Sequence, residues 1–174
     1  MAYTEKNTAT EAQKKAGAFL SRCRPGFEKS VQLDPDIAVT GGIPAVGTEM
    51  PDGTIYAGIS PDTNQLMYAA PADAPISMDF NAAAKYAKGL QVGDKKDFRV
   101  PSKAELDVLF RNREEGALKG AFNLTGAFPA SYYWSSTTIV DGGDNCGCYQ
   151  RFSDGVRHDH YLDRGMSVRC IRSV

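Results

Sequence analysis

The chain lacks any hydrophobic run near the roughly 18 residues that a membrane-spanning helix needs. Its N-terminal stretch Met1–Asn7 also lacks the apolar core of a secretory signal. Neither sign of charge is in surplus, since 20 Lys and Arg oppose 21 Asp and Glu, and this balance argues against gripping nucleic acid through a basic face. We therefore expect a protein made in the cytoplasm, with no membrane insertion and no nucleic acid as partner.

Cysteine and histidine are also sparse. The four cysteines are scattered, at Cys23, Cys146, Cys148 and Cys170, and they do not form the disulfide framework of a small secreted domain. Both histidines, His158 and His160, fall in one short run, and no Ser/His/Asp or Cys/His catalytic arrangement is recognisable. We expect a protein that is not an enzyme and that carries no cofactor.

What is present is typical of one globular domain. The chain has 174 residues, of which 42% are hydrophobic and 24% charged. A helical pattern over residues 8–22 predicts an N-terminal extension, residues 1–46, that carries one helix. From residue 47 to 174 the order is a hairpin, two helices and several strands, which predicts an α+β fold.

The local signals for these elements are specific. Runs at residues 55–59 and 65–69 flank a turn-rich segment and predict a hairpin. A helix should follow, capped by Ser77 or Asp79, with its apolar stripe from Phe80 to Leu90. Ser102 and Glu105 have the spacing of a capping box. The helix they begin should bury Leu106, Leu109 and Phe110.

The C-terminal part predicts strands around residues 133–138, 149–152, 156–161 and 166–171, with Tyr133, Trp134 and Cys170 in the core. The turn at residues 153–155 leaves the register open. A two-residue turn would pair Ser153 with Val156, whereas a three-residue turn would pair Phe152 with Val156.

Four motifs together resemble a known family. They are Asp97–Leu106 (DFRVPSKAEL), Tyr133–Thr137 (YWSST), Phe152–Gly155 (FSDG) and Ser167–Arg172 (SVRCIR). In this order they resemble the bacterial and phage C-type-lectin-like modules that are distantly related to the formylglycine-generating enzyme fold. The resemblance covers residues 47–174 and is nearest to the variable proteins of diversity-generating retroelements, including phage receptor-binding tail proteins. It implies two helices packed on small antiparallel sheets.

The resemblance also implies a diversified surface. In that family reverse transcription randomises adenines, and the altered codons cannot encode Met, Trp, Gln, Lys or Glu. None of these occurs in Ile139–Tyr149 (the first window) or Val156–Arg164 (the second window). Such a surface would bind a cell-surface protein or glycan, and would work on a virion or cell surface. The residues it would offer are Ile139, Val140, Asp141, Asp144, Asn145, Cys146, Cys148, Tyr149, Arg157, His158, Asp159, His160, Tyr161, Asp163 and Arg164.

Between and around the windows, the stretches 132–138, 150–154 and 166–172 are predicted to be a fixed framework. A diversified surface would use Tyr and Arg as anchors and small polar residues as adaptable contacts.

A zinc-stabilised or redox-active protein is the alternative. Cys146-x-Cys148 and His158-x-His160 would each place soft ligands on one face of a strand, and the three-residue turn would set Cys148 opposite His160. Calcium-dependent sugar binding is not implied, because the chain has no Glu-Pro-Asn, Gln-Pro-Asp or Trp-Asn-Asp run.

Overall fold

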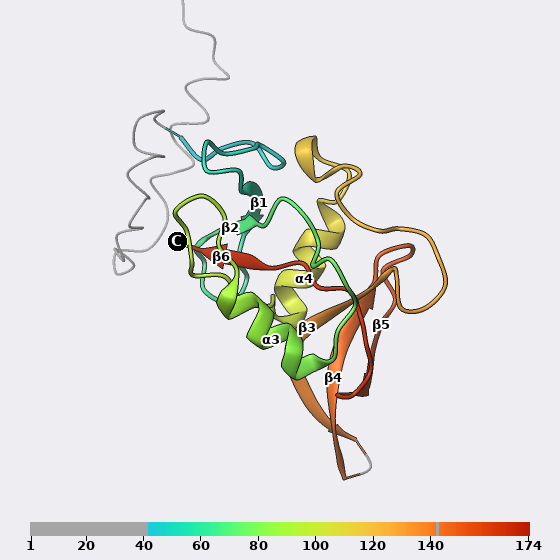
Figure 1. Ribbon diagram of the computed structural model, residues 1–174. Helices are drawn as coiled ribbons and strands as arrows, with labels where there is room; N and C mark the ends of the chain where they lie inside the picture. The colour runs from blue at the N-terminus through green and yellow to red at the C-terminus, as the bar shows by residue number, and fades with distance from the viewer. Residues whose placement is uncertain (1–41, 142) are drawn as a thin grey trace, which may run out of the picture. The chain divides into compact units, whose positions relative to one another are not determined.

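The computed structural model describes residues 42–141 and 143–174, so the predicted helix at 8–22 and most of the N-terminal extension lie outside the described residues. Two helices and two small antiparallel sheets make up the fold (Figure 1), which confirms the predicted α+β class. The elements are β1 (Ile55–Ile59), β2 (Leu66–Ala69), α3 (Phe80–Gly89), α4 (Lys103–Arg111), the short 3₁₀ helix η2 (Gly116–Leu118), β3 (Tyr132–Asp141), β4 (Asp144–Arg151), β5 (Arg157–Tyr161) and β6 (Ile171–Ser173). Neither described helix has the length and apolar character needed to cross a bilayer.

The first sheet has the strand order β1-β2-β6. The predicted hairpin is confirmed, and β2 is the central strand because Met67 pairs with Ser173 and Ala69 with Ile171. The predicted strand at 166–171 is wrong over most of its length. Met166 and Ser167 form only isolated bridges, and the regular strand begins at Ile171.

The side chain of Arg169 gives the physical reason for this break. It is fully buried, and its guanidinium donates to the Asp73 carboxylate at 2.7 Å and to the Ala70 carbonyl at 2.8 Å. The same group lies over the Phe122 ring, 4.6 Å from the ring centroid. A buried charge needs such partners, and the chain around it crosses between the sheets instead of extending a ladder.

Both helix starts agree with the sequence. The Asp79 side chain accepts from the Ala82 N–H at the start of α3. At the start of α4 the capping box is complete, because the Ser102 hydroxyl accepts from the Glu105 N–H and the Glu105 carboxylate accepts from the Ser102 N–H. Leu106 and Leu109 are buried as predicted, and Phe110 is half-buried.

The second sheet has the order β3-β4-β5 and carries most of both windows. Its central strand β4 starts at Asp144, well before the predicted strand at 149–152. Asp141 pairs with Asp144, so the first window is the end of a long hairpin rather than an irregular loop. The β3–β4 ladder shifts register between Trp134 and Thr138, a bulge that bends and twists the hairpin.

The turn between β4 and β5 differs from both registers that the sequence left open. Gln150 pairs with Arg157, and the Arg151 N–H donates to the Val156 carbonyl, so four residues form the turn. Phe152 does not pair in the β4–β5 ladder, because its ring is fully buried against Tyr133, Phe110 and Phe122.

The two helices pack on opposite faces of the second sheet. The Phe80 ring of α3 meets the Trp134 ring edge-on at 5.6 Å, on what we name the α3 face. Asp107 of α4 accepts a hydrogen bond from Gln150 at 3.2 Å, on the α4 face. Trp134 pairs with Tyr149 and Tyr133 with Gln150, and because side chains alternate along a strand these pairs assign every residue of the sheet to one face.

Candidate functional site

The observed register separates the cysteines from the histidines. Cys148 lies opposite Asp159 and Cys146 opposite Tyr161, all on the α4 face. His158 lies opposite Tyr149 and His160 opposite Gly147, on the α3 face. A Cys₂His₂ zinc site needs all four ligands on one side of the strand pair, so this register does not support the alternative. Within the described residues, no three His, Cys, Asp or Glu side chains converge as metal ligands would.

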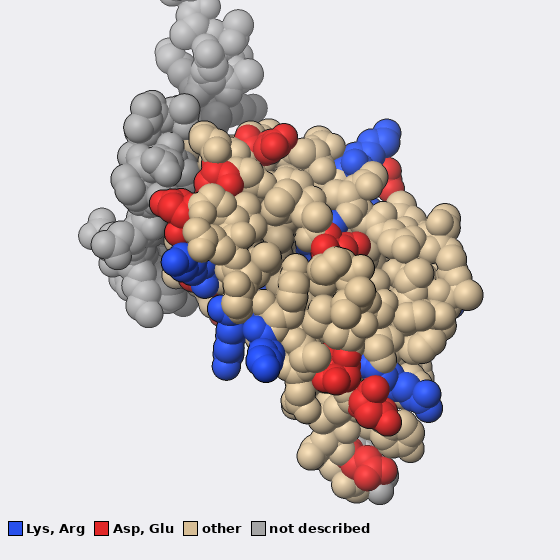
Figure 2. Space-filling view, viewed as in Figure 1, with Lys and Arg blue, Asp and Glu red and all other residues tan. Residues whose placement is uncertain are grey.

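Most of the predicted surface residues are exposed. Val140 is 71% exposed and Tyr161 54%. The other exposed members are Ile139, Asp144, Asn145, Arg157, His158, Asp163 and Arg164, whereas Tyr149, Asp159 and His160 are half-buried. Asp144 stands at the end of the β3–β4 hairpin, and Figure 2 shows acidic side chains at that end of the molecule.

Two predicted surface residues are buried. Cys146 is 5% exposed and Cys148 is 3% exposed. Burial raises the pKa of the Cys148 thiol, and the nearby carboxylate of Asp159 adds to the rise, so the thiolate needed for redox chemistry is disfavoured. The two cysteines act as small apolar side chains under the sheet.

An array of aromatic rings covers the α3 face beyond Trp134. The Tyr149 ring stacks on His158 at 6.2 Å with an interplanar angle of 27°, and Tyr132 lies 5.6 Å from Tyr149. The centroid of the Phe128 ring lies 5.1 Å from that of Tyr132 and 6.3 Å from that of His160. Phe128 and Tyr132 were not predicted as site residues. Phe128 is exposed in a loop with no periodic signal, and only the pairing of β3 with β4 brings Tyr132 near the second window.

A surface hollow of about 400 Å³ runs along β5. It is lined by Cys146, Tyr149, His158, Asp159, His160 and Tyr161. Four of these are consecutive, and consecutive strand residues point to opposite faces, so the hollow follows the outer edge of β5, which is an edge strand.

The imidazoles of His158 and His160 contact backbone groups along that edge. The His160 Nδ1 accepts from the Tyr161 N–H at 2.8 Å, and the His158 Nδ1 lies 3.1 Å from the Asp159 carbonyl oxygen. Because the Arg151 N–H bonds to the Val156 carbonyl, the backbone N–H and C=O groups of Val156, His158 and His160 point toward β4. The N–H of Tyr161 and the carbonyl of Asp159 therefore point outward, away from β4. An exposed edge of this kind invites another strand, and the ring nitrogens occupy two of its groups.

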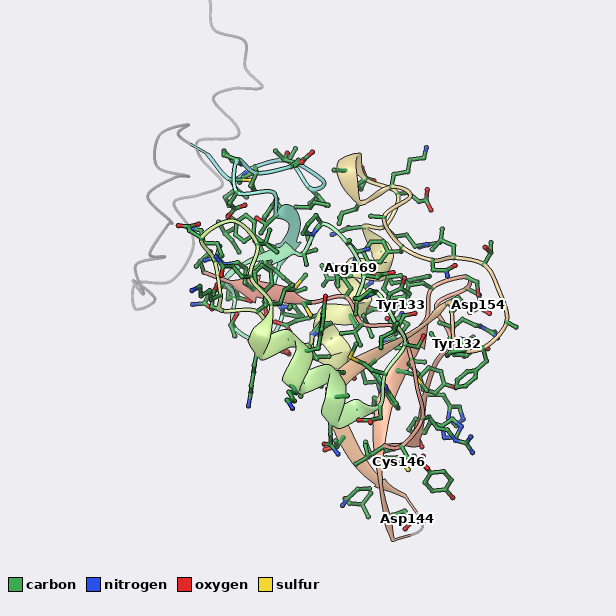
Figure 3. The ribbon with its side chains drawn as sticks, viewed as in Figure 1. Tyr132, Tyr133, Asp144, Cys146, Asp154 and Arg169 are labelled. Carbon is green, nitrogen blue, oxygen red and sulfur yellow. The ribbon has the colours of Figure 1, made fainter. Side chains whose placement is uncertain are left out.

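The sheet is tied to the framework at the end formed by the β4–β5 turn. Asp107 accepts from Gln150 and forms ion pairs with Arg111 and, at 3.4 Å, with Arg157. In the β4–β5 turn Arg151 pairs with Asp154 and donates to the Tyr132 hydroxyl at 3.2 Å. Figure 3 shows Tyr132 and Asp154 at the end of the sheet far from Asp144, with Cys146 between them.

Comparisons with known proteins add little to this geometry. No protein-family model matches the chain, and no curated protein matches it. Among solved structures, the chain is similar to botrocetin, with 11% sequence identity and a TM-score of 0.41, over 62% of this chain and 91% of that one.

Proposed function

We propose that this protein is a non-enzymatic recognition module with a C-type-lectin-like architecture. Its second sheet would present a diversified surface to a cell-surface protein or glycan, on a virion or a cell. The observation that carries the proposal is a division within one sheet. Framework side chains such as Tyr133, Trp134 and Gln150 are at most 1% exposed, whereas Val140 and Tyr161 in the windows are more than half exposed.

This division is what a variable surface requires. Substituting a buried side chain costs about 2–5 kcal/mol, a large fraction of the about 5–15 kcal/mol that stabilises a domain. Substituting an exposed one away from special features stays within about 0.5 kcal/mol. The exposed window positions can therefore change together while the fold persists.

The chemistry of the surface also suits recognition. Tyr149, Tyr161 and the two imidazoles are rigid aromatic groups with polar tips, the kind that anchor binding surfaces at low entropic cost. Asp144, Asn145 and Asp163 add exposed polar groups from the same windows. No nucleophile or general acid is required for this activity, because affinity comes from contacts and shape.

One test exchanges exposed side chains and measures binding. A variant with Val140, Asn145 and Tyr161 replaced by alanine should keep its melting temperature within a few degrees. Labelled full-length protein should then show an altered pattern on a panel of immobilised glycans and intact bacterial cells. The matched control replaces Lys88, Asp94 and Lys96, which are exposed and outside the windows.

The control should leave the binding pattern unchanged. An identical pattern for wild type and the window variant would contradict the proposal. The diversification has its own test in the gene, namely a nearby near-copy of the 3′ end with adenines where the two differ, beside a reverse transcriptase. Sibling genes should vary in the windows and share Trp134 and Arg169, and uniform variation along the chain would contradict it.

A further inference from the structure

We propose that the hollow along β5 binds a positively charged group, either a quaternary ammonium or the cationic side chain of a protein receptor. This inference rests on the proposed recognition function and names the chemistry of its ligand. It depends on three features: the aromatic rings of the hollow, its one carboxylate, and the pairing of the nearby arginines with other acidic residues.

Two phenol rings, from Tyr149 and Tyr161, and two imidazoles, from His158 and His160, line the hollow. The face of a phenol ring carries negative electrostatic potential and attracts a cation within about 6 Å. The rings are held in place, since Tyr149 stacks on His158 and the His160 Nδ1 accepts a backbone N–H. A cation would therefore meet ring surfaces that are already ordered.

The lining of the hollow carries one carboxylate beside its two imidazoles. Asp159 is its only acidic lining residue, and no Lys or Arg lines it. The Asp159 carboxylate lies 3.6 Å from the His158 Nδ1. Burial raises the pKa of the Tyr149 hydroxyl, Tyr132 and Asp159 add to the rise, and the Arg151 guanidinium opposes it. The Asp159 carboxylate and Tyr161 reach this edge hollow from the α4 face, and Tyr149, His158 and His160 reach it from the α3 face. A carboxylate flanked by aromatic side chains suits an ammonium or guanidinium better than an anion.

The two arginines nearest in the ladder are engaged elsewhere. Arg157 lies opposite Gln150 on the α4 face and pairs with Asp107. Arg151 pairs with Asp154, and its guanidinium lies over the Tyr132 ring at 5.7 Å from the ring centroid. The ring array thus already holds one guanidinium at its framework end, next to Tyr149, and leaves the hollow itself without a cation among its lining side chains.

Titration with small cations tests the inference, using the full-length protein and choline chloride followed by NMR. Choline should shift the resonances of Tyr149 and His158, and its neutral isostere 3,3-dimethylbutan-1-ol should bind at least about fivefold more weakly. Acetyl-lysinamide, its trimethylated form and acetyl-argininamide separate the two sources. Preference for the trimethylated or choline group indicates a quaternary ammonium, and preference for the simple side chains indicates a protein receptor.

Two substitutions remove the two attractions separately. Tyr149→Leu keeps apolar bulk without the ring face, and Asp159→Asn keeps shape without the charge, so each should weaken choline binding about three- to tenfold. Tyr86→Leu on α3 and Asp94→Asn, both outside the hollow, are the matched controls and should bind like wild type. A melting temperature for each variant confirms folding, and Asp159→Asn keeps the test valid if Tyr149→Leu is unstable.

The outcomes separate this inference from the proposed function. Equal binding of choline and its neutral isostere, or no binding of any cation, overturns the cationic ligand. If the glycan and cell panel still responds to the window variant in that case, the recognition function stands and only its ligand chemistry is wrong. Cation binding that Asp159→Asn leaves unchanged also overturns the inference.

Discussion

Replacing Gly147 by alanine should destabilise the protein, although Gly147 lies inside the first window. A Cβ atom at this position would stand 2.7 Å from Cδ2 of Phe80 and 2.8 Å from Cζ3 of Trp134. Both distances are shorter than real Cβ contacts allow, so at least one ring must move. Trp134 is fully buried and its indole N–H donates to the Met78 carbonyl, which leaves Phe80 as the ring that yields.

The size of the effect follows from the crowding. Inserting a methyl group into a packed site costs about 1–3 kcal/mol, and for a domain of this size each kcal/mol lowers the melting temperature by about 4 °C. Gly147→Ala should thus lower the melting temperature by about 4–12 °C in differential scanning calorimetry. Asn145→Ala, two residues away on the same face and exposed, should change the stability by less than about 0.5 kcal/mol.

A second substitution tests the cause. Phe80→Leu removes the ring that the new methyl group would strike, at the expense of its contact with Trp134. In that background Gly147→Ala should cost less, with a coupling energy of about 0.5–3 kcal/mol in a double-mutant cycle. An unchanged melting temperature for Gly147→Ala, or equal costs in both backgrounds, would refute the packing argument.

Three further predictions concern titration and metal. Burial alone raises the pKa of Glu105, but hydrogen bonds from Arg99, Ser60 and the Ser102 N–H together lower it. The stabilisation that the ionised carboxylate gives is therefore present at neutral pH and is lost as pH falls through the folded-state pKa. In urea unfolding, the free energy of unfolding of Glu105→Gln should lie well below that of wild type at pH 7 and approach it in acid. Burial raises the pKa of Cys170 to about 12 and also raises that of Cys148. In a Cys23→Ser variant, a thiol reagent at pH 8 should therefore label these two cysteines only when the protein unfolds. Rapid labelling of the native protein would contradict their burial. Elemental analysis should find zinc far below one equivalent per chain, and stoichiometric zinc lost on Cys148→Ser would restore the alternative.

The elements predictable from the sequence are those set by near neighbours. The capping box joins Ser102 and Glu105 over one helical turn, and the β1–β2 hairpin depends on a turn between two short runs. Each is stable for reasons present within about fifteen residues. These predictions needed no knowledge of what the segments pack against.

The features that escaped prediction depend on distant partners. The β4–β5 turn has four residues because Phe152 is drawn into a core with Phe110 and Phe122, and its sequence alone is compatible with shorter turns. The strand expected at residues 166–171 breaks because Arg169 turns inward to Asp73, about a hundred residues earlier in the chain. The aromatic array was missed for the same reason, since Phe128 and His160 meet only in the folded protein.

The register of the displayed surface is set by residues outside the windows. A slip of one residue between β4 and β5 would exchange the two faces, and it is opposed by the burial of Phe152 and by the Arg151–Asp154 pair in the turn. Within the windows, Gly147 and Cys148 are constrained by packing and Arg157 by its ion pair with Asp107. The positions free to change are therefore fewer than the windows contain. They concentrate at the hairpin end and along β5, where the hollow offers its rings and its single carboxylate.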